Sequence, residues 1–239
     1  MKTNKIIILL LAMVAVIPLQ SRAQSSAVLH PCRDNTIYNN DGQARTDSLS
    51  NGTGEYFVTG NVNTAYYIRR ALIKFDFCDV PSSAIVDSVV LAIKAKQNAQ
   101  NDTGDREFSL YRLTSTWGEG TSNAGSTPGT GTYATTGDAT WKWNFYTSSQ
   151  WTTPGGDYYG TASGNTGILT GNLVNVNVYW RSSMAGNSPM VSDVQNWING
   201  VNYGWIIIGV EDGTLKTATM FYSRESSYPP TLTVYYHMP

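Results

Sequence analysis

The chain has few of the side chains on which metal centres and enzyme active sites are commonly built. Its 239 residues include only two cysteines and two histidines, and His30 and His237 lie near opposite ends. This set argues against a zinc site, which needs four cysteine or histidine ligands in most structural cases. The chain also has no G-x-S-x-G elbow and no H-E-x-x-H helix. These absences argue against the hydrolases that depend on such motifs.

Carboxylate chemistry needs no such motif and stays open. Glu119, Asp138, Asp157 and Glu211 would have to meet in space to act as a glycosidase pair, so a polysaccharide hydrolase or lyase is the third alternative. Calcium needs six to eight oxygen ligands, and there is no dense D-x-D-x-D-G run. We expect no cofactor, with a structural calcium as an open alternative whose candidate ligands are Asp34, Asp138 and Asp157. The simpler role for these aspartates is to cap turns.

Charge is sparse as well. Charged residues make up 14% of the chain and aromatic residues 12%, with 22 glycines, which is not the composition of a disordered protein. Without residues 1–23, Lys+Arg falls from 16 to 13 against 17 Asp+Glu, a net charge of −4. A general nucleic-acid binder needs a basic excess, so we expect no nucleic-acid partner.

The N-terminus has the pattern of an export signal. Lys2 and Lys5 precede the apolar run Ile6–Leu19, and Ser21-Arg22-Ala23 is a small-x-small cleavage site. The run is short for a membrane span. A lipid anchor is not indicated, because the cleavage site has no cysteine. We therefore predict a signal peptide at 1–23, a secreted protein that is extracellular or on the cell surface, and no membrane association after cleavage. The alternative is an uncleaved anchor. The remainder, 24–239, fits a single β-domain.

Both cysteines lie in the exported part. In an oxidising compartment two cysteines most simply form one bridge, so a Cys32–Cys78 disulfide is predicted. The alternative is a pair of unpaired thiols.

Most of the chain after Ala23 has the pattern of short strands separated by turns. The expected strands are rich in Val, Ile, Thr and aromatics, with Gly, Asn, Asp and Pro between them. They are Thr36–Tyr38, Glu55–Thr59, Ile68–Phe77, Ser88–Ala95, Phe108–Leu113, Val174–Tyr179, Trp205–Val210 and Thr231–Tyr236. Without a βαβ rhythm, this predicts an all-β fold, an antiparallel β-sandwich of jelly-roll type. Ile206–Ile208 is apolar throughout, which indicates a central strand covered on both sides.

One short helix is predicted in the second half of the chain. Ser188 can cap it, Pro189 suits its first turn and Asn199-Gly200 can end it. The apolar residues with helical spacing are Val191, Val194, Trp197 and Ile198, so we expect them to face the core.

Aromatic residues in a long glycine-rich segment, Trp117–Tyr159, are a candidate sugar site. Trp141, Trp143 and Trp151 could stack on the C–H faces of sugar rings. Their apolar area would equally anchor the segment to the core, which is the competing interpretation.

A basic strand is the leading candidate site. Arg69, Arg70 and Lys74 lie on one predicted strand, and period two puts Arg70 and Lys74 on one face. Lys94 and Lys96 extend this face if the next strand is a neighbour. An arginine fork can hold a uronate carboxylate in two places, whereas lysine offers a point charge. The alternative is that these cations pair with nearby acids and contribute little.

Several segments together resemble a known family. They are Asp34–Tyr38, Arg70–Asp76, Ile85–Ile93, Tyr111–Leu113 with Trp117–Gly120, Gly137–Trp141, and Ser223-Arg224-Glu225 with the last strand. Their order resembles that of DNRLRE-domain (disaggregatase-related) proteins, carbohydrate-binding module family 96. The resemblance implies a β-sandwich that binds polysaccharide, with acidic glycans such as alginate among the ligands.

The resulting hypothesis is a secreted, non-catalytic carbohydrate-binding module for an acidic, alginate-like polysaccharide. The alternative is a structural or adhesive surface or matrix protein, because an abundance of tyrosine, 15 in the chain, also suits an interaction surface and self-association.

Overall fold

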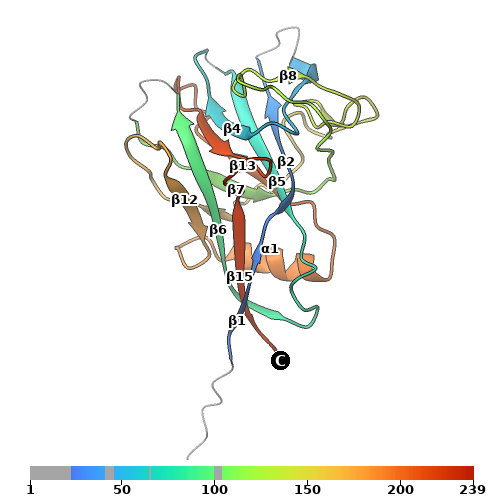
Figure 1. Cartoon of the computed structure of the whole chain (residues 1–239), viewed down its shortest axis with the longest axis vertical. Coiled ribbons are helices and arrows are strands. Elements are labelled where there is room, and N and C mark those ends of the chain that lie inside the picture. The colour runs from blue at the N-terminus through green and yellow to red at the C-terminus, as the bar shows by residue number, and fades with distance from the viewer. Residues whose placement is uncertain (1–22, 41–45, 65, 100–103) are drawn as a thin grey trace, which may run out of the picture.

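Figure 1 shows the computed structural model, which describes residues 23–40, 46–64, 66–99 and 104–239. The predicted signal peptide lies outside the described residues, apart from Ala23. The strands are β1 (Ser25–Leu29), β2 (Pro31–Tyr38), β3 (Leu49–Ser50), β4 (Tyr56–Asn61), β5 (Ile68–Phe75), β6 (Ile85–Asn98), β7 (Ser109–Arg112), β8 (Thr132–Tyr133), β9 (Trp143–Phe145), β10 (Ser149–Gln150), β11 (Gly164–Asn165), β12 (Asn177–Arg181), β13 (Trp205–Ile208), β14 (Thr219–Tyr222) and β15 (Thr231–His237). The helices are η1 (Thr46–Ser48), a 3-10 turn, and α1 (Pro189–Ile198).

A large antiparallel sheet curls over to make the two layers of an all-β, jelly-roll-like sandwich. Its hydrogen-bonded order is β1-β15-β6-β14-β4-β5-β13-β7-β11, with β12 added to β6 and β2 added to β5. One layer holds β1, β15, β6 and β12, the other holds β2, β5, β13, β7 and β11, and β14 and β4 connect them. The predicted fold class is confirmed.

The main core fills the space between the two layers. Leu91 and Ile93 from β6 and Ala71 and Ile73 from β5 are buried within one apolar cluster. The residues between them on the same strands point away from this core, because successive side chains of a strand point to opposite faces. The sandwich therefore has two outer faces, and what covers each of them decides where a ligand can bind.

The central strand β13 confirms the prediction of two covered faces. It pairs with β5 on one side and β7 on the other. Ile207 belongs to the main core, whereas Ile206 belongs to a second apolar cluster on the outer face. That second cluster is formed by the long segment after β7.

The predicted helix is present and packs at the end of the sandwich. Ser188 precedes it and Pro189 begins it, although the Ser188 side chain makes no capping hydrogen bond. Val194 and Trp197 are buried, and the Trp197 and Trp205 rings meet at 4.7 Å. Figure 1 shows α1 crossing the lower end of the two layers. None of the helices in the described ranges is long and apolar enough to span a membrane.

The sequence prediction lacks seven of the described strands, β1, β3, β8, β9, β10, β11 and β14, and of these β1 and β14 are longer than two residues and lie in the large sheet. β1 contains two serines and an alanine, and β14 is only four residues long. Each is a strand because neighbouring strands supply its backbone hydrogen-bond partners. β1 pairs along β15, and β14 lies between β4 and β6. Local propensity alone does not show this pairing.

Candidate functional site

The predicted basic strand is β5, and it places its three cations in three different surroundings. Arg69 is 2% exposed. Its Nε donates to the Gly129 carbonyl at 2.8 Å, and its Nη1 donates to the Asn39 and Ile68 carbonyls at 2.9 and 3.0 Å. Its guanidinium also lies over the Tyr38 ring, 4.9 Å from the centroid. Arg69 is therefore held inside the protein by neutral groups.

Arg70 is occupied by an internal ion pair. Its Nε and Nη2 donate to the two carboxylate oxygens of Glu211 at 2.9 and 2.7 Å, and its Nη1 donates to the Gly155 carbonyl at 2.8 Å. The guanidinium also lies 4.7 Å from the Trp141 ring and 5.7 Å from the Tyr158 ring. The hydrogen bond to Glu211 raises the pKa of Arg70 despite its burial. Arg70 is thus committed to holding the long segment against the sheet.

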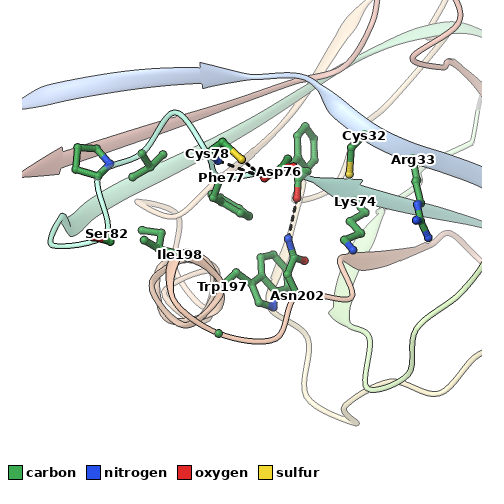
Figure 2. Close-up of a pocket in the computed structure, with 14 residues that line it drawn as sticks. Cys32, Arg33, Lys74, Asp76, Phe77, Cys78, Ser82, Trp197, Ile198 and Asn202 are labelled. Atoms are coloured by element: carbon green, nitrogen blue, oxygen red, sulfur yellow. Dashed lines mark hydrogen bonds between the residues drawn. The ribbon is translucent and has the colours of Figure 1, made fainter.

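Lys74 lines an open cleft of about 860 Å³ between the end of β5 and α1. Figure 2 shows Lys74 and Arg33 on one side of this cleft and Ser82 and Ile198 on the other. Arg33 donates from Nη1 to the Trp117 carbonyl at 3.0 Å, and Asn202 donates to the Phe75 carbonyl at 2.7 Å. The cleft has one basic end, but its aromatic residues Phe75, Phe77 and Trp197 are all buried, so they offer no stacking surface.

The predicted Cys32–Cys78 disulfide is wrong, since both are exposed free thiols. Cys32 lies at a register shift in β2 opposite the end of β5, whereas Cys78 lies beyond that end. The Cys78 thiol donates instead to Asp76 at 3.0 Å, which raises the pKa of Cys78, and burial raises the pKa of Cys32. Figure 2 shows the two side chains apart on the rim of the cleft.

Lys94 and Lys96 do not extend the face of Arg70. They lie on β6, which is not a hydrogen-bonded neighbour of β5 and belongs to the other layer. The prediction that they extend the face of Arg70 required the two strands to be neighbours, and they are not. The two lysines belong to a different surface, described below.

The tryptophan-rich segment packs onto the sheet. Trp151 is 4% exposed, joins the second apolar cluster with Leu72 and Ile206, and donates from Nε1 to the Thr140 carbonyl at 2.9 Å. Trp141 packs against this cluster beneath Arg70, and Trp143 is half-buried against Tyr146. The geometry of Trp151 matches the anchoring interpretation, so the segment covers the outer face of the β5 layer.

The three candidate calcium ligands each accept hydrogen bonds within the fold. Asp138 accepts the Thr135 N–H at 2.6 Å, and Asp157 accepts the N–H groups of Thr152 and Thr153 at 2.9 and 2.8 Å. Asp34 accepts the N–H of Arg224 at 2.7 Å. In the described ranges no group of three or more His, Cys, Asp or Glu side chains is arranged to hold a metal ion.

One of these aspartates belongs to a charged network. Arg224 binds both oxygens of Glu119 at 2.7 Å and also contacts Glu225 at 2.8 Å. Glu119 in turn accepts the Asp34 N–H at 2.8 Å. Three of the segments that carry the family resemblance therefore meet here, and the network ties β2 to the connection between β14 and β15. Its carboxylates are engaged with Arg224 and with the backbone.

The outer face of the other layer carries tyrosines and lysines, of which Tyr228 is exposed, Tyr222 is buried and the others are half-buried. We call the set Tyr56, Lys94, Lys96, Tyr222 and Tyr228 the tyrosine–lysine face. The Tyr222 ring lies 5.2 Å from the Tyr56 ring and 4.9 Å from the Tyr228 ring. The Lys94 ammonium is 3.6 Å from the Tyr228 ring centroid, and Lys96 is 5.8 Å from that of Tyr222. Tyr228 is 50% exposed.

Neither lysine of this face pairs with a carboxylate in the described part of the chain. Beside them, β12 pairs along β6 and adds Tyr179 and Arg181, which is stacked over Tyr179 at 4.2 Å. The acid at the end of the face is Glu55. Burial of the Tyr56 ring, followed by the interaction with Glu55, raises the pKa of Tyr56. The face thus combines one exposed aromatic ring, Tyr228, with half-buried lysines that have no carboxylate partner among the described residues.

Sequence reasoning identified Lys94 and Lys96 but missed the tyrosines around them. The alternation along β6 separates the lysines from Leu91 and Ile93, which was a usable signal. Nothing local showed that β12 and β14 flank β6, because that pairing joins segments far apart in the chain.

No protein-family model matches the chain, and no curated protein is significantly similar to it.

Proposed function

We propose that this protein is an exported, non-catalytic carbohydrate-binding module that holds an acidic polysaccharide on the tyrosine–lysine face. The observation that carries this proposal is an uncovered sheet face where tyrosine rings lie next to lysines with no carboxylate partner among the described residues. The resemblance to carbohydrate-binding module family 96 supports the same class of ligand.

The chemistry of this face suits an acidic sugar chain. Tyrosine rings present apolar surface that packs against the C–H faces of sugar rings, with a hydroxyl at the edge for hydrogen bonds. Lys94 and Lys96 add point charges for carboxylates, and Arg181 adds a planar fork. Ala92 and Thr231, which are paired on neighbouring strands, keep the surface between them low enough for an extended ligand.

The carboxylates that could have formed a glycosidase pair support the non-catalytic form of the proposal. Glu119 is bound by Arg224 and Glu211 by Arg70. Asp138 and Asp157 accept backbone N–H groups in separate turns. Each is engaged in holding the fold, which leaves none of the four poised as a general acid beside the tyrosine–lysine face.

The experiment is a binding assay of residues 24–239 with acidic and neutral polysaccharides, including alginate, at low and high salt. We expect binding to alginate that weakens as salt rises, because exposed charges are screened. The double variant Lys94→Gln/Lys96→Gln should lower the affinity by about tenfold through loss of two charge-assisted contacts. Tyr228→Ala should weaken binding at both salt concentrations.

The matched control is Lys74→Gln/Lys142→Gln, which removes the same charge from other surfaces. It should bind as the parent protein does. A loss of binding in this control but not in Lys94→Gln/Lys96→Gln would move the site to the surface of Lys74, in the cleft of Figure 2, or to that of Lys142, and would contradict the assignment to the tyrosine–lysine face. Absence of binding to every acidic glycan would favour a structural or adhesive protein instead.

A further inference from the structure

Arg69 combines three properties that are seldom found together in a structural arginine. It is 2% exposed, it carries a positive charge, and none of its partners is a carboxylate in the described ranges. Burial lowers the pKa of Arg69 to about 10, so the group is still protonated at neutral pH. A buried charge without a counter-charge is costly unless a partner compensates it.

One edge of this guanidinium has no partner among the residues that the structure describes. Arginine has five N–H donors. The Nε donor is used by Gly129, and the two Nη1 donors are used by Asn39 and Ile68. Nη2 makes no hydrogen bond to any described residue, so two donors of one nitrogen remain for a ligand.

A cavity of about 440 Å³ lies against Arg69, and its lining is polar but uncharged elsewhere. Among the described residues the polar lining consists of Asn40, Asn63, Tyr67, Gln97, Asn98 and Thr130. No acidic side chain of the described chain lines it. Amide groups, one phenol and one cation are the donors and acceptors with which proteins bind the hydroxyl and carboxylate groups of a uronic acid. The volume is in the usual range of small-molecule sites.

The cavity adjoins the tyrosine–lysine face. Val58 and Met220 line it, and they lie two positions along β4 and β14 from Tyr56 and Tyr222, with which they share an orientation. On β6, Gln97 in the lining directly follows Lys96. In the described part of the chain the cavity and the tyrosine–lysine face are therefore adjacent on β4, β6 and β14.

We propose that this Arg69 cavity is a carboxylate-selective subsite, in which the guanidinium binds the carboxylate of one uronic acid residue of the acidic polysaccharide. The inference extends the proposed function, since the rest of that polysaccharide lies along the tyrosine–lysine face. The subsite supplies selectivity because a neutral sugar in the same place leaves the buried charge uncompensated.

The test compares two trisaccharides that differ only at the carboxyl groups: β-1,4-linked trimannuronate and β-1,4-linked mannotriose. We expect the parent protein to bind trimannuronate at least about tenfold more tightly, in keeping with the cost of leaving a buried charge unpaired. Arg69→Met should reduce this preference to the part that Lys94 and Lys96 supply. That variant removes three internal hydrogen bonds and can unfold, so a second variant is needed.

Asn63→Trp leaves Arg69 in place and fills the entrance, because Asn63 is exposed and lines the cavity. The matched control is Thr64→Trp, which adds the same indole at the next exposed position outside the lining. Isothermal titration calorimetry should show the full preference for trimannuronate in the parent and in Thr64→Trp, and a clearly smaller preference in Asn63→Trp, where only Lys94 and Lys96 still favour the carboxylates.

The two proposals fail in different ways. If Asn63→Trp keeps the preference of the parent, the Arg69 subsite is wrong while binding on the tyrosine–lysine face stands. If the parent binds neither trisaccharide and no acidic polysaccharide, the proposed function and the subsite are both wrong.

Discussion

At the scale of the residue, three cations that look equivalent in the sequence have different roles. Arg69 is buried among carbonyl groups, Arg70 is paired with Glu211, and Lys74 lines a cleft. The two-residue alternation of a strand predicts which face each side chain lies on, but not which groups it contacts there. Apart from the Ile68 carbonyl, the hydrogen-bond partners of Arg69 and Arg70 lie between 30 and 141 residues away in the chain.

Arg70 is accordingly predicted to stabilise the fold and not to bind the ligand. Arg70→Ala leaves Glu211 without its cation in a partly buried site and should lower the free energy of unfolding by about 2–4 kcal/mol. Binding to alginate by the folded fraction should stay close to that of the parent. Urea denaturation and a binding titration on the same preparation would check both, and a loss of binding without loss of stability would contradict the assignment.

Asp34 predicts a specific pH dependence. Burial, followed by the charges of Glu225 and Glu119, raises the pKa of Asp34 well above its usual value of 3.8, although the N–H of Arg224 opposes the shift. The folded state then holds this proton more tightly than the unfolded chain does. Its contribution to stability is present at low pH and is lost as the pH rises from about 4 through the raised pKa.

Asp34→Asn removes this titration. The difference in melting temperature, variant minus parent, should therefore become more positive as the pH is raised from 4 to 7. Thermal unfolding followed by circular dichroism at several pH values would measure it. A difference that does not change with pH would mean that Asp34 titrates in the same way in the folded and unfolded states.

At the scale of the element, the segment between Trp117 and Tyr159 is an added layer with its own small core. Leu113, Trp117, Ala139 and Trp151 cover Ile37, Leu72 and Ile206 of the sheet. Its glycines permit close approaches, since a Cβ at Gly120, where φ is +68°, would lie 1.5 Å from Asp138 Oδ1. The segment therefore excludes ligands from one outer face and leaves the other face open.

Trp151→Ala tests this role. It removes a buried indole and its hydrogen bond to Thr140, so the free energy of unfolding should fall by about 3–5 kcal/mol. The half-buried Trp143 serves as the comparison, and Trp143→Ala should cost clearly less. Chemical denaturation would rank the two. Equal, small effects would indicate a segment only loosely attached to the sheet.

At the scale of the whole molecule, the described fold is stabilised by packing without a covalent cross-link. The two thiols are exposed, and the apolar core runs from β1 to β15 between the layers. The charge is distributed so that a molecule of net negative charge after the predicted cleavage still presents a basic strip on one face.

Both thiols should consequently react with a thiol reagent in the native protein. We expect two thiols per chain in a titration without denaturant, and a melting temperature that a reducing agent leaves unchanged. Cys78 should react more slowly at a given pH than a free thiol, because Asp76 raises its pKa and the thiolate is the reactive form. If no thiol is detected until denaturant and reductant are added, the protein contains the Cys32–Cys78 disulfide after all.

The sequence by itself determined the elements whose signals are local. Local patterns predict two strands and the helix, because backbone geometry and neighbouring side chains are enough to form them. These are the alternating Thr231–Tyr236, the uniformly apolar Ile206–Ile208 and α1 (Pro189–Ile198). Tertiary structure alone decided which face of the sandwich is open, which carboxylate meets Arg70, and that Arg69 lies against a cavity while Cys32 and Cys78 stay apart. Each of these depends on the pairing of segments far apart in the chain, which the burial of the whole apolar core selects and no short pattern encodes.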